Sequence, residues 1–273
     1  MHFKKNTSNE KRDFNHSEWE LPDFSVSEFR PKQQKYCICI FVINEGQRII
    51  SQLMKMNPLN QIVDIIIADG GSNDGSLDPG FLKEIGVKTL LTKTGPGRLS
   101  AQMRMAFAYT LRVGYNGVIT IDGNDKDDAN AIPAFCKALD DGYDHVQGSR
   151  YRKGGTHRNT PLLRSIGVRF VHSPLISLAA GFHYTDTTNG FRAYSKRFLT
   201  DERVATFRHI FSDYELHYYL AIRASRLGFR VAEIPVTRIY PVQGLVPTKI
   251  APFKGDWIIL RTLIKACLGQ YNP

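Results

Sequence analysis

The stretch Ile62–Gly75, IVDIIIADGGSNDG, decides the fold of this chain. Its first half, Ile62–Ala68, is a short apolar run rich in β-branched residues, which is typical of a strand buried on both faces of a sheet. Its second half, Asp69–Gly75, must be a loop, because its glycines permit tight turns. A carboxylate at such a strand end, here Asp69, accepts hydrogen bonds from a nucleobase or from ribose hydroxyls. The alternative is that Asp69 only closes an ordinary Asx turn.

Strands and helices alternate on both sides of this stretch. The sequence predicts strands at Tyr36–Ile43, Ile62–Ala68, Val87–Leu91 and Gly117–Ile121, and helices at Glu45–Lys55, Leu77–Ile85 and Arg98–Val113. This order predicts an α/β fold, namely one Rossmann-like domain whose mainly parallel sheet is covered by helices on both faces. Ligands of such folds bind beyond the carboxyl ends of the strands. We therefore expect three loops to meet at one edge of the sheet: Asn44-Glu45, Asp69–Gly75 and Asp122–Asp128.

The second half of the chain is less regular. The expected elements are helices at Ile132–Leu139, Pro161–Ala180, Tyr214–Leu227 and Phe253–Leu268, strands at Asp144–Gln147, Gly190–Tyr194 and Arg230–Pro235, and loops at Arg150–Thr160 and Arg238–Lys249. We expect residues 1–34 to be a flexible arm followed by a loosely docked segment, because they are polar. Residues 35–240 then form the domain, and residues 241–273 add a loop and an amphipathic C-terminal helix.

The 273 residues carry a formal net charge of +10, which suits an anionic partner such as a nucleotide, a lipid phosphate, a membrane surface or nucleic acid. Charge alone does not choose among them. The cysteines show no zinc or CxxC spacing, so we expect reduced thiols in a cytoplasmic protein. We find no signal peptide and no apolar stretch of the roughly 18–20 residues that span a bilayer. At a membrane, the protein would lie on the inner surface.

A second acidic loop follows the strand at Gly117–Ile121. Its sequence, Ile119–Asp125, is ITIDGND. Carboxylate and amide oxygens gathered at a strand end suit Mg²⁺ or Mn²⁺, and such an ion would neutralise charge on a diphosphate leaving group. The alternative is a solvated acidic turn that caps the helix near Asn130.

Together these motifs resemble the inverting family 2 glycosyltransferases. In that family one strand ends in Asn-Glu, as at Asn44-Glu45, a second in a VDDGSxDGT-like loop, as at Ala68–Gly75, and a third in an Asp-x-Asp metal motif, as at Ile121–Asn124. Three further segments are similar to the dolichyl/polyprenyl-phosphate sugar synthase branch: Gly148–Tyr151 with Gly154-Gly155, Asp186–Tyr194, and Glu233–Val236 with Arg238. The resemblance covers residues 36–240. It implies a GT-A fold, a nucleotide-diphospho-sugar donor and a divalent cation.

The resemblance also implies roles for single residues. Those matched to nucleotide binding are Asn44, Glu45, Asp69, Gly71, Ser72, Gly97, Arg98 and Gly123. Asp122 and Asn124 match the metal motif, Arg150 faces the diphosphate or the acceptor phosphate, and Arg238 contacts phosphate. Asp186, Asn189 and Arg192 match the acceptor side.

Two positions depart from the family pattern. The second Asp of the first loop is Gly70, and the metal motif reads Asp-Gly-Asn, with Asp125 adjacent. An amide oxygen such as that of Asn124 is a weaker ligand than a carboxylate, because it is neutral.

The catalytic base depends on the acceptor. Asp213 and Glu215 open a helix where many saccharide-directed relatives place a catalytic carboxylate, since an alcohol needs a general base. A lipid phosphate is already anionic and needs none. The alternative for both residues is a favourable charge at a helix N-terminus. The histidines show no HxxxH or HxH spacing, and we interpret them as structural or surface residues.

Basic residues gather in two places. The first set favours phosphate recognition, with a solvated loop as the alternative, and consists of Arg150, Arg152, Lys153, His157, Arg158 and Arg164. The second set of basic residues lies in the predicted helices Pro161–Ala180 and Phe253–Leu268, which also carry apolar stripes. Such helices can lie in a membrane interface, and packing on the core or in an oligomer is an equal alternative.

We therefore predict transfer of a sugar, with inversion, from a nucleotide-diphospho-sugar to a polyprenyl-phosphate or other lipid-linked acceptor. A saccharide acceptor in surface-polysaccharide assembly is the first alternative. A sugar-phosphate nucleotidylyltransferase, suggested by Gly95–Leu99, is the second. We do not expect nucleic-acid binding, because the net positive charge is the only feature of the sequence that favours it.

Overall fold

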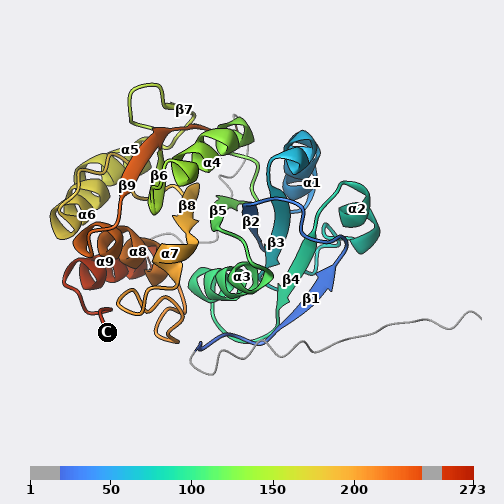
Figure 1. Cartoon of the computed structure of the whole chain (residues 1–273). Helices are drawn as coiled ribbons and strands as arrows, with labels where there is room; N and C mark the ends of the chain where they lie inside the picture. The colour runs from blue at the N-terminus through green and yellow to red at the C-terminus, as the bar shows by residue number, and fades with distance from the viewer. Residues whose placement is uncertain (1–18, 242–253) are drawn as a thin grey trace, which may run out of the picture.

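The computed structural model describes residues 19–241 and 254–273, without the side chains of 254–256. The strands are β1 (Phe24–Glu28), β2 (Cys37–Val42), β3 (Asp64–Asp69), β4 (Thr89–Lys93), β5 (Gly117–Asp122), β6 (His145–Ser149), β7 (Thr156–Arg158), β8 (Arg192–Ser195), β9 (Val231–Pro235) and β10 (Thr237–Ile239). The helices are α1 (Gln47–Met56), η1 (Asn57–Gln61), α2 (Pro79–Glu84), α3 (Leu99–Val113), η2 (Ala129–Ala131), α4 (Ile132–Asp140), α5 (Leu162–Gly167), η3 (Val168–His172), α6 (Ser173–Ala180), α7 (Lys196–Leu199), α8 (Glu215–Arg226) and α9 (Lys254–Cys267). Figure 1 shows their arrangement.

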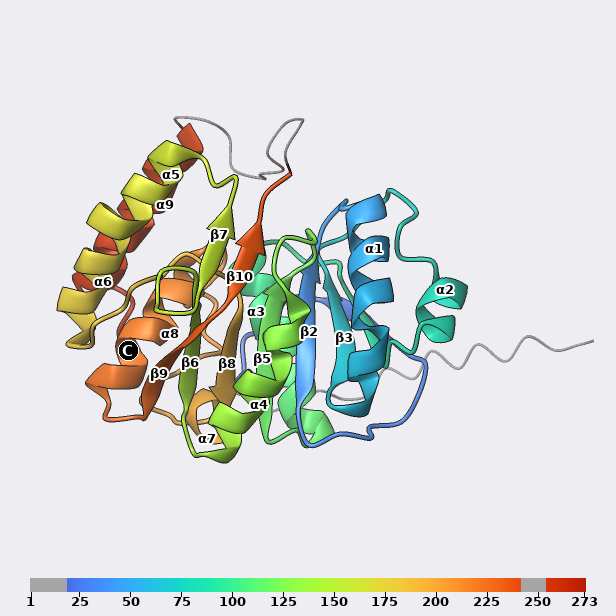
Figure 2. The same cartoon turned by 90° about the horizontal axis from the view of Figure 1, so that it is seen from above.

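One eight-stranded sheet forms the centre, in the order β1-β4-β3-β2-β5-β8-β6-β9. The pairs β2–β3, β2–β5, β3–β4 and β6–β9 are parallel, whereas β1 pairs antiparallel with β4 and β8 lies antiparallel between β5 and β6. The short strands β7 and β10 pair in parallel beside it. The predicted α/β fold with a mostly parallel sheet and helices on both faces is confirmed (Figure 2).

Strand β2 shows why the central strands are apolar throughout. Successive side chains of a strand point to opposite faces. Cys37, Cys39 and Phe41 pack in one core cluster together with α3 and α8. Ile38, Ile40 and Val42 pack in the other, together with α1, α2 and α4. All six residues are buried.

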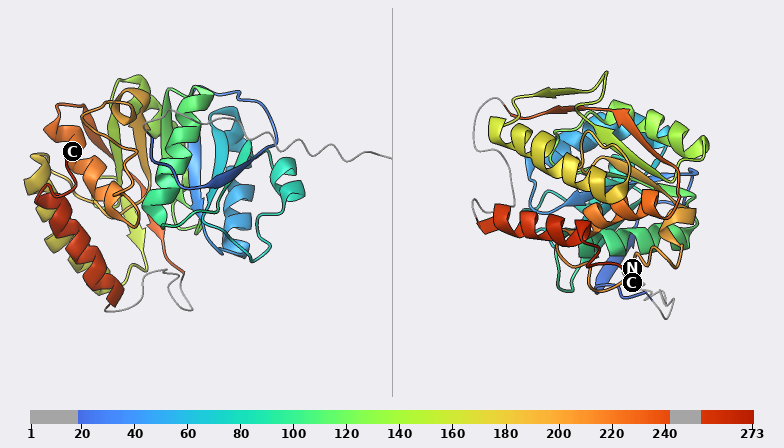
Figure 3. Two further views of the ribbon diagram at one scale, coloured as in Figure 1. Left: turned by 90° about the horizontal axis from the view of Figure 1, so that it is seen from below. Right: turned by 90° about the vertical axis from the view of Figure 1, so that its left-hand side faces the viewer.

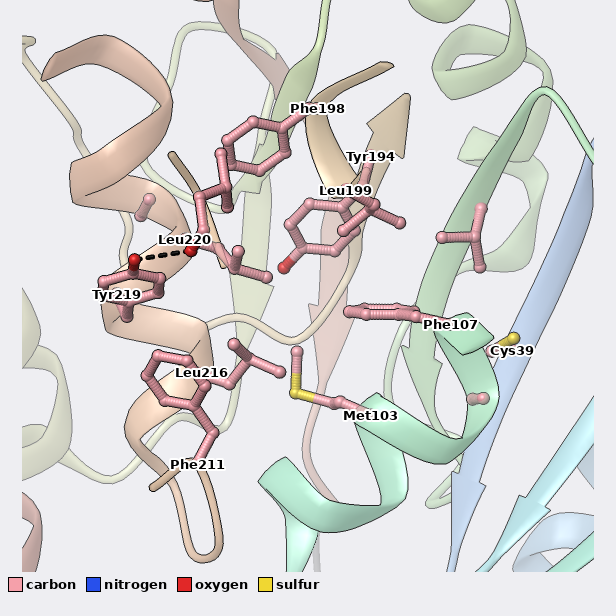
Figure 4. Close-up of a cluster of buried hydrophobic side chains, with 14 of the residues drawn as sticks. Cys39, Met103, Phe107, Tyr194, Phe198, Leu199, Phe211, Leu216, Tyr219 and Leu220 are labelled. Carbon is pink, nitrogen blue, oxygen red and sulfur yellow. Dashed lines mark hydrogen bonds between the residues drawn. The ribbon is translucent and has the colours of Figure 1, made fainter. Parts of the chain in front are cut away.

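The larger cluster holds α3 and α8 against the sheet (Figure 4). Met103 and Phe107 of α3 are fully buried near Tyr194 of β8 and Leu216 of α8. Phe107 and Tyr194 have ring centroids 5.3 Å apart. Removing a buried ring of this kind costs about 3–5 kcal/mol of stability. The packing therefore fixes the N-termini of α3 and α8 relative to the strand ends.

The edge strand β1 lies where the sequence predicts only a loosely docked segment. Phe24 is paired with Lys93 and Glu28 with Thr89, so the regular structure begins before Tyr36. The sequence pattern does not predict this strand, because a short, half-exposed strand is stabilised by pairing with its neighbour rather than by its own composition. Residues 1–18 of the predicted arm lie outside the described part of the chain.

Three other predictions change in detail. The helix predicted at Pro161–Ala180 has a π-helical turn, Val168–His172, between α5 and α6. The loops predicted at Arg150–Thr160 and Arg238–Lys249 contain β7 and part of β10, respectively, while residues 242–249 lie outside the described part. All four cysteines are free thiols. Among the described helices, none has the length and apolarity to cross a membrane.

Candidate active site

The strands on either side of β2, namely β3 and β5, each end in an acidic residue. Val42 at the end of β2 is paired with Asp69 of β3, and Phe41 with Asp122 of β5. Both acids end strands that run parallel to β2 on either side of it. Asp69 and Asp122 therefore lie at the same edge of the sheet, as the strand pattern predicts.

Hydrogen bonds join the loops that follow β2 and β3. Ser72 donates its hydroxyl to Asp69 Oδ1 over 2.6 Å and its backbone N–H over 2.9 Å. The Asn44 backbone N–H donates to Ser72 Oγ over 2.9 Å. The Gly46 N–H donates to Asp74 Oδ2 over 2.8 Å. Asp69 is buried and accepts the backbone N–H of Ser72, three residues on, so it holds the loop in shape, and its contact with a nucleoside stays a prediction.

Two further residues of these loops are constrained locally. Glu45 accepts two hydrogen bonds from Arg48, over 2.9 Å from Nε and 2.7 Å from Nη2. Gly71 has a φ of +98°, a backbone conformation that favours glycine.

The departure at Gly70 has a physical reason in Gln102, a residue that sequence reasoning missed. Gln102 reaches from α3 to the strand ends, and its Nε2 donates to the carbonyls of Val42 and Ala68 over 3.1 and 3.0 Å. A Cβ on Gly70 would lie 3.1 Å from that Nε2 atom. The amide of Gln102 thus borders the position of the missing Asp side chain.

The loop around Gly97 meets the segment before α8. The Arg98 backbone N–H donates to the Ser212 carbonyl over 2.8 Å, and Gly97 has a φ of +98°. The Arg98 and Asp213 side chains are 3.9 Å apart and largely exposed. Glu215 accepts the Asp213 backbone N–H over 2.8 Å, and burial raises its pKa. Glu215 therefore holds the segment just before α8 through the Asp213 N–H.

Arg238 joins two acids on the other side of the rim. Its Nη2 lies 3.0 Å from Asp122 Oδ2, and its Nη1 bonds to Asp127. Burial would raise the pKa of Asp122, but Arg238 brings it below its usual value. For Asp127, burial outweighs Arg238 and raises the pKa to about 6. The predicted phosphate contact of Arg238 would have to form beside these two carboxylates.

Glycines let the chain pass close to Asp122. A Cβ on Gly190 would lie 2.8 Å from Asp122 Oδ1, and one on Gly123 would lie 2.8 Å from Val42 Cγ2. Gly123 is thus required by its contact with β2, independently of any nucleotide.

The residues around Asp122 fit a divalent cation. Asn124 donates from Nδ2 to Asp122 Oδ2 over 3.5 Å, and its buried Oδ1 has no hydrogen-bond partner within the described residues. The buried His217 Nε2 likewise has none there. Burial lowers the pKa of His217 to about 3, while the Asp122 carboxylate opposes this shift. A neutral imidazole and two side-chain oxygens are donors that such ions accept.

His217 is the second residue that sequence reasoning missed, since its helical neighbours carry no metal-binding spacing. The described residues contain no group of three or more His, Cys, Asp or Glu side chains placed to hold a metal. An ion at Asp122 would therefore depend on Asn124 and on oxygens of a bound diphosphate.

Arg150 and Asp186 form a buried ion pair. Arg150 Nε and Nη2 lie 2.6 and 3.0 Å from the two carboxylate oxygens, and Nη2 also donates to Thr188 Oγ1 over 2.8 Å. Burial would raise the pKa of Asp186, but Arg150 lowers it. Asp186 therefore positions Arg150, and its place on the acceptor side stays a prediction.

Arg192, which the resemblance assigns to the acceptor side, bonds within the protein in this structure, and its acceptor contact stays a prediction. It is fully buried, and its guanidinium donates to three backbone carbonyls, those of Asn189 over 3.0 Å, Thr187 over 2.8 Å and His217 over 2.6 Å. These bonds tie β8 to α8. Asn189 accepts the Phe191 N–H over 3.0 Å and lies 3.5 Å from Arg238, so it stays within the site.

Four cations surround the phenol of Tyr240, and we call this group with Tyr240 the Tyr240 cation cluster. Arg164 donates to the Tyr240 hydroxyl over 3.2 Å, and Lys126 Nζ lies 4.9 Å from the ring centroid. The Arg238 guanidinium lies 5.7 Å from it. Burial would raise the pKa of Tyr240, but Arg238, Arg164 and Arg150 together lower it. Of the basic residues predicted to recognise phosphate, Arg150 and Arg164 are in this cluster, while Arg152, Lys153, His157 and Arg158 are exposed.

Comparison with known proteins gives relatives in sequence and in structure. No family model matches the chain. It is 31% identical over 154 residues to the dolichyl-phosphate hexose transferase of Haloferax volcanii, a match that covers 56% of this chain and 62% of the relative, which is less than two thirds of it. It is 29% identical over 212 residues to the polyprenol monophosphomannose synthase of Mycolicibacterium smegmatis, covering 76% and 78% of the two chains.

The fold is also that of solved glycosyltransferases. Glucosyl-3-phosphoglycerate synthase from Mycobacterium tuberculosis, in complex with Mn²⁺, UDP and glucosyl-3-phosphoglycerate, superposes with a TM-score of 0.62 over 87% of this chain and 80% of its own, at 17% identity. The solved structure shares the fold of this chain, and both sequence relatives are named as enzymes of polyprenyl-linked sugar transfer or synthesis.

Proposed function

We propose that this glycosyltransferase moves a sugar from a nucleotide-diphospho-sugar to a polyprenyl phosphate. The observation that carries the proposal is the Tyr240 cation cluster next to Asp122. Arg150 and Arg238 already have carboxylate partners, and a phosphate head group supplies up to two further charges and several strong acceptors for the cations gathered here. The relatives named above, which act on dolichyl or polyprenyl phosphates, support the same acceptor, and neither a saccharide acceptor nor a nucleotidylyltransferase is favoured by them.

In the proposed reaction an anionic oxygen of the acceptor phosphate attacks the anomeric carbon of the sugar. The bond from that carbon to the diphosphate breaks, its electron pair leaves with the nucleoside diphosphate, and the anomeric configuration inverts. The attacking oxygen carries no proton that must be removed, so the mechanism needs no general base. This agrees with Glu215, whose carboxylate is engaged at the start of α8.

The residues of this chain have distinct tasks in that reaction. Arg238 and Arg150 stabilise negative charge on the phosphates, and Asp186 holds Arg150 in place through two hydrogen bonds. Asp69 and the loop that it shapes hold the nucleoside end. Asp122 and Asn124, with His217, would hold a divalent cation, which supplies charge neutralisation for the diphosphate when bound.

The test is transfer by the purified full chain from GDP-mannose, UDP-glucose and other common sugar nucleotides to polyprenyl phosphate. The control acceptor is the same polyprenol without phosphate. Mass spectrometry should find glycosyl polyprenyl phosphate and a nucleoside diphosphate, with the alcohol at least about 100-fold poorer because it lacks the charged oxygens that the guanidinium groups would bind and that would attack the sugar. Equal transfer to the alcohol or to a saccharide would refute the acceptor, and pyrophosphate release would indicate a nucleotidylyltransferase.

A further inference from the structure

A long stretch of helix exposes large apolar side chains to solvent. Along α5, η3 and α6 the exposed fraction is 74% for Leu162, 84% for Leu163, 70% for Phe170 and 79% for Leu178. Scattered apolar residues on a surface are ordinary, but a continuous set on one element indicates a contact surface.

Helix α9 adds a second set beside the first. Trp257 is 67% exposed, Ile264 43% and Leu268 70%. The helices α6 and α9 contact each other and both pack on α8, and they run side by side along one side of the molecule (Figure 3). A hollow of about 430 Å³ lies along α9, lined by Trp257, Leu260, Arg261, Ile264, Lys265 and Gln270.

The charges on these helices are predominantly positive, and Asp256 of α9 is the one acid in their sequences. Arg169 and Arg261 are exposed and Lys265 is half-buried, whereas residues 161–181 and 257–273 contain no Asp or Glu. Exposed apolar side chains with basic residues among them suit the interface of an anionic bilayer. A symmetric contact between two copies would bring the positive charges of Arg169, Arg261 and Lys265 together, with only Asp256 as an acid in the sequences of these helices.

The same helices lead into the active site. Arg164 of α5 donates to the Tyr240 hydroxyl, and Arg238, two residues before Tyr240, pairs with Asp122. A lipid whose phosphate lies in the Tyr240 cation cluster would thus have its hydrocarbon tail close to α5, where Leu162 and Leu163 are exposed.

We propose that α5, η3, α6 and α9 form a docking face for an anionic membrane surface. The face, defined by Leu162, Leu163, Phe170, Leu178, Trp257, Ile264 and Leu268 with Arg169, Arg261 and Lys265, enters the interfacial layer without crossing it. The inference deepens the proposed function, on which it rests for its purpose, because the face brings the cation cluster to the phosphates of a lipid acceptor.

The test is co-sedimentation of the full chain with vesicles of phosphatidylcholine alone or mixed with phosphatidylglycerol. We expect binding to the mixed vesicles. The double variant Leu163→Ser/Phe170→Ser should bind at least about tenfold more weakly, since two large apolar groups no longer enter the interface. Arg169→Gln/Arg261→Gln should lose the preference for phosphatidylglycerol. The matched control is Met54→Ser, an exposed apolar residue of α1, which should bind like the parent chain.

Each outcome separates the docking face from the enzymatic proposal. Transfer to a short, water-soluble polyprenyl phosphate needs no vesicle, and the face variants should keep it. Transfer to that acceptor by a chain that does not bind vesicles would overturn the docking face and keep the proposed function. Vesicle binding that depends on the docking face, in a chain that transfers no sugar, would keep the docking face and overturn the proposed function. A stable dimer in light scattering that Leu163→Ser/Phe170→Ser dissolves would assign the face to a second copy and overturn the membrane proposal.

Discussion

Arg238 and Asp122 come from positions 116 residues apart and meet with Nη2 3.0 Å from Oδ2. The same guanidinium also bonds to Asp127, so one cation serves two acids at the rim of the sheet. Under the proposed function, a bound diphosphate and its cation would share this cluster of charges.

Asp122→Asn should lower turnover at least about 100-fold while the protein stays folded, since the variant keeps the shape but removes the charge that the site presents to a cation. The measurements are product formation at saturating donor and the thermal unfolding midpoint. Asp125→Asn is the matched control, because that neighbouring carboxylate pairs with Lys55 over 2.6 Å, and its turnover should change little. Near-normal turnover in Asp122→Asn would remove this residue from the mechanism.

His217→Ala and Asn124→Ala should each weaken Mn²⁺ binding by about tenfold, because each removes a donor atom from a small ligand set. Free Mn²⁺ is counted by electron paramagnetic resonance in the presence of UDP or GDP. His209→Ala changes a histidine that lies on the surface and should leave Mn²⁺ affinity unaltered. An unchanged affinity in His217→Ala would show that the imidazole does not reach the ion.

Gly70→Asp, which restores the acid of the family pattern, should destabilise this chain by about 1–3 kcal/mol. The new Cβ would press on Gln102, whose hydrogen bonds to Val42 and Ala68 would be strained or lost. Urea unfolding measures the cost, and the same substitution in a Gln102→Ala background should cost less. An equal cost in both backgrounds would contradict the role given to Gln102.

Stability should fall as the solution becomes more acidic than about pH 6.5. Burial lowers the pKa of His145 well below 6.5, and those of His172 and His217 also lie below it. The unfolded chain therefore binds protons that the native chain does not. Each histidine contributes a loss of up to about 1.4 kcal/mol per pH unit below that point.

Urea unfolding at about pH 7.5 and about pH 5.5 measures this loss. His145→Phe removes one titrating group from a site that is already aromatic, beside Tyr194 at 5.3 Å between ring centroids. The pH slope of the variant should be smaller than that of the parent chain. An identical slope would mean that His145 is protonated equally in both states.

The sequence by itself determined the central strands and the edge at which the site lies. Ile62–Ala68 and its neighbours are apolar at every position because both faces of the sheet are covered, and such runs are visible without a structure. Parallel strands place their carboxyl ends together, so Asp69 and Asp122 could be assigned to one rim from their positions after strands.

Only the tertiary structure decided which side chains share that rim and what each one does. The pairing of β1 with β4 and the insertion of β8 between β5 and β6 leave no periodic signal. Three contacts depend on how α3 and α8 pack on the sheet. They are the position of Gln102 beside Gly70, the position of His217 near Asp122, and the hydrogen bonds from Arg192 to backbone carbonyls. Hydrophobic periodicity reports which face of an element is buried, whereas hydrogen bonds and ion pairs between distant segments depend on positions that packing alone sets to within an ångström.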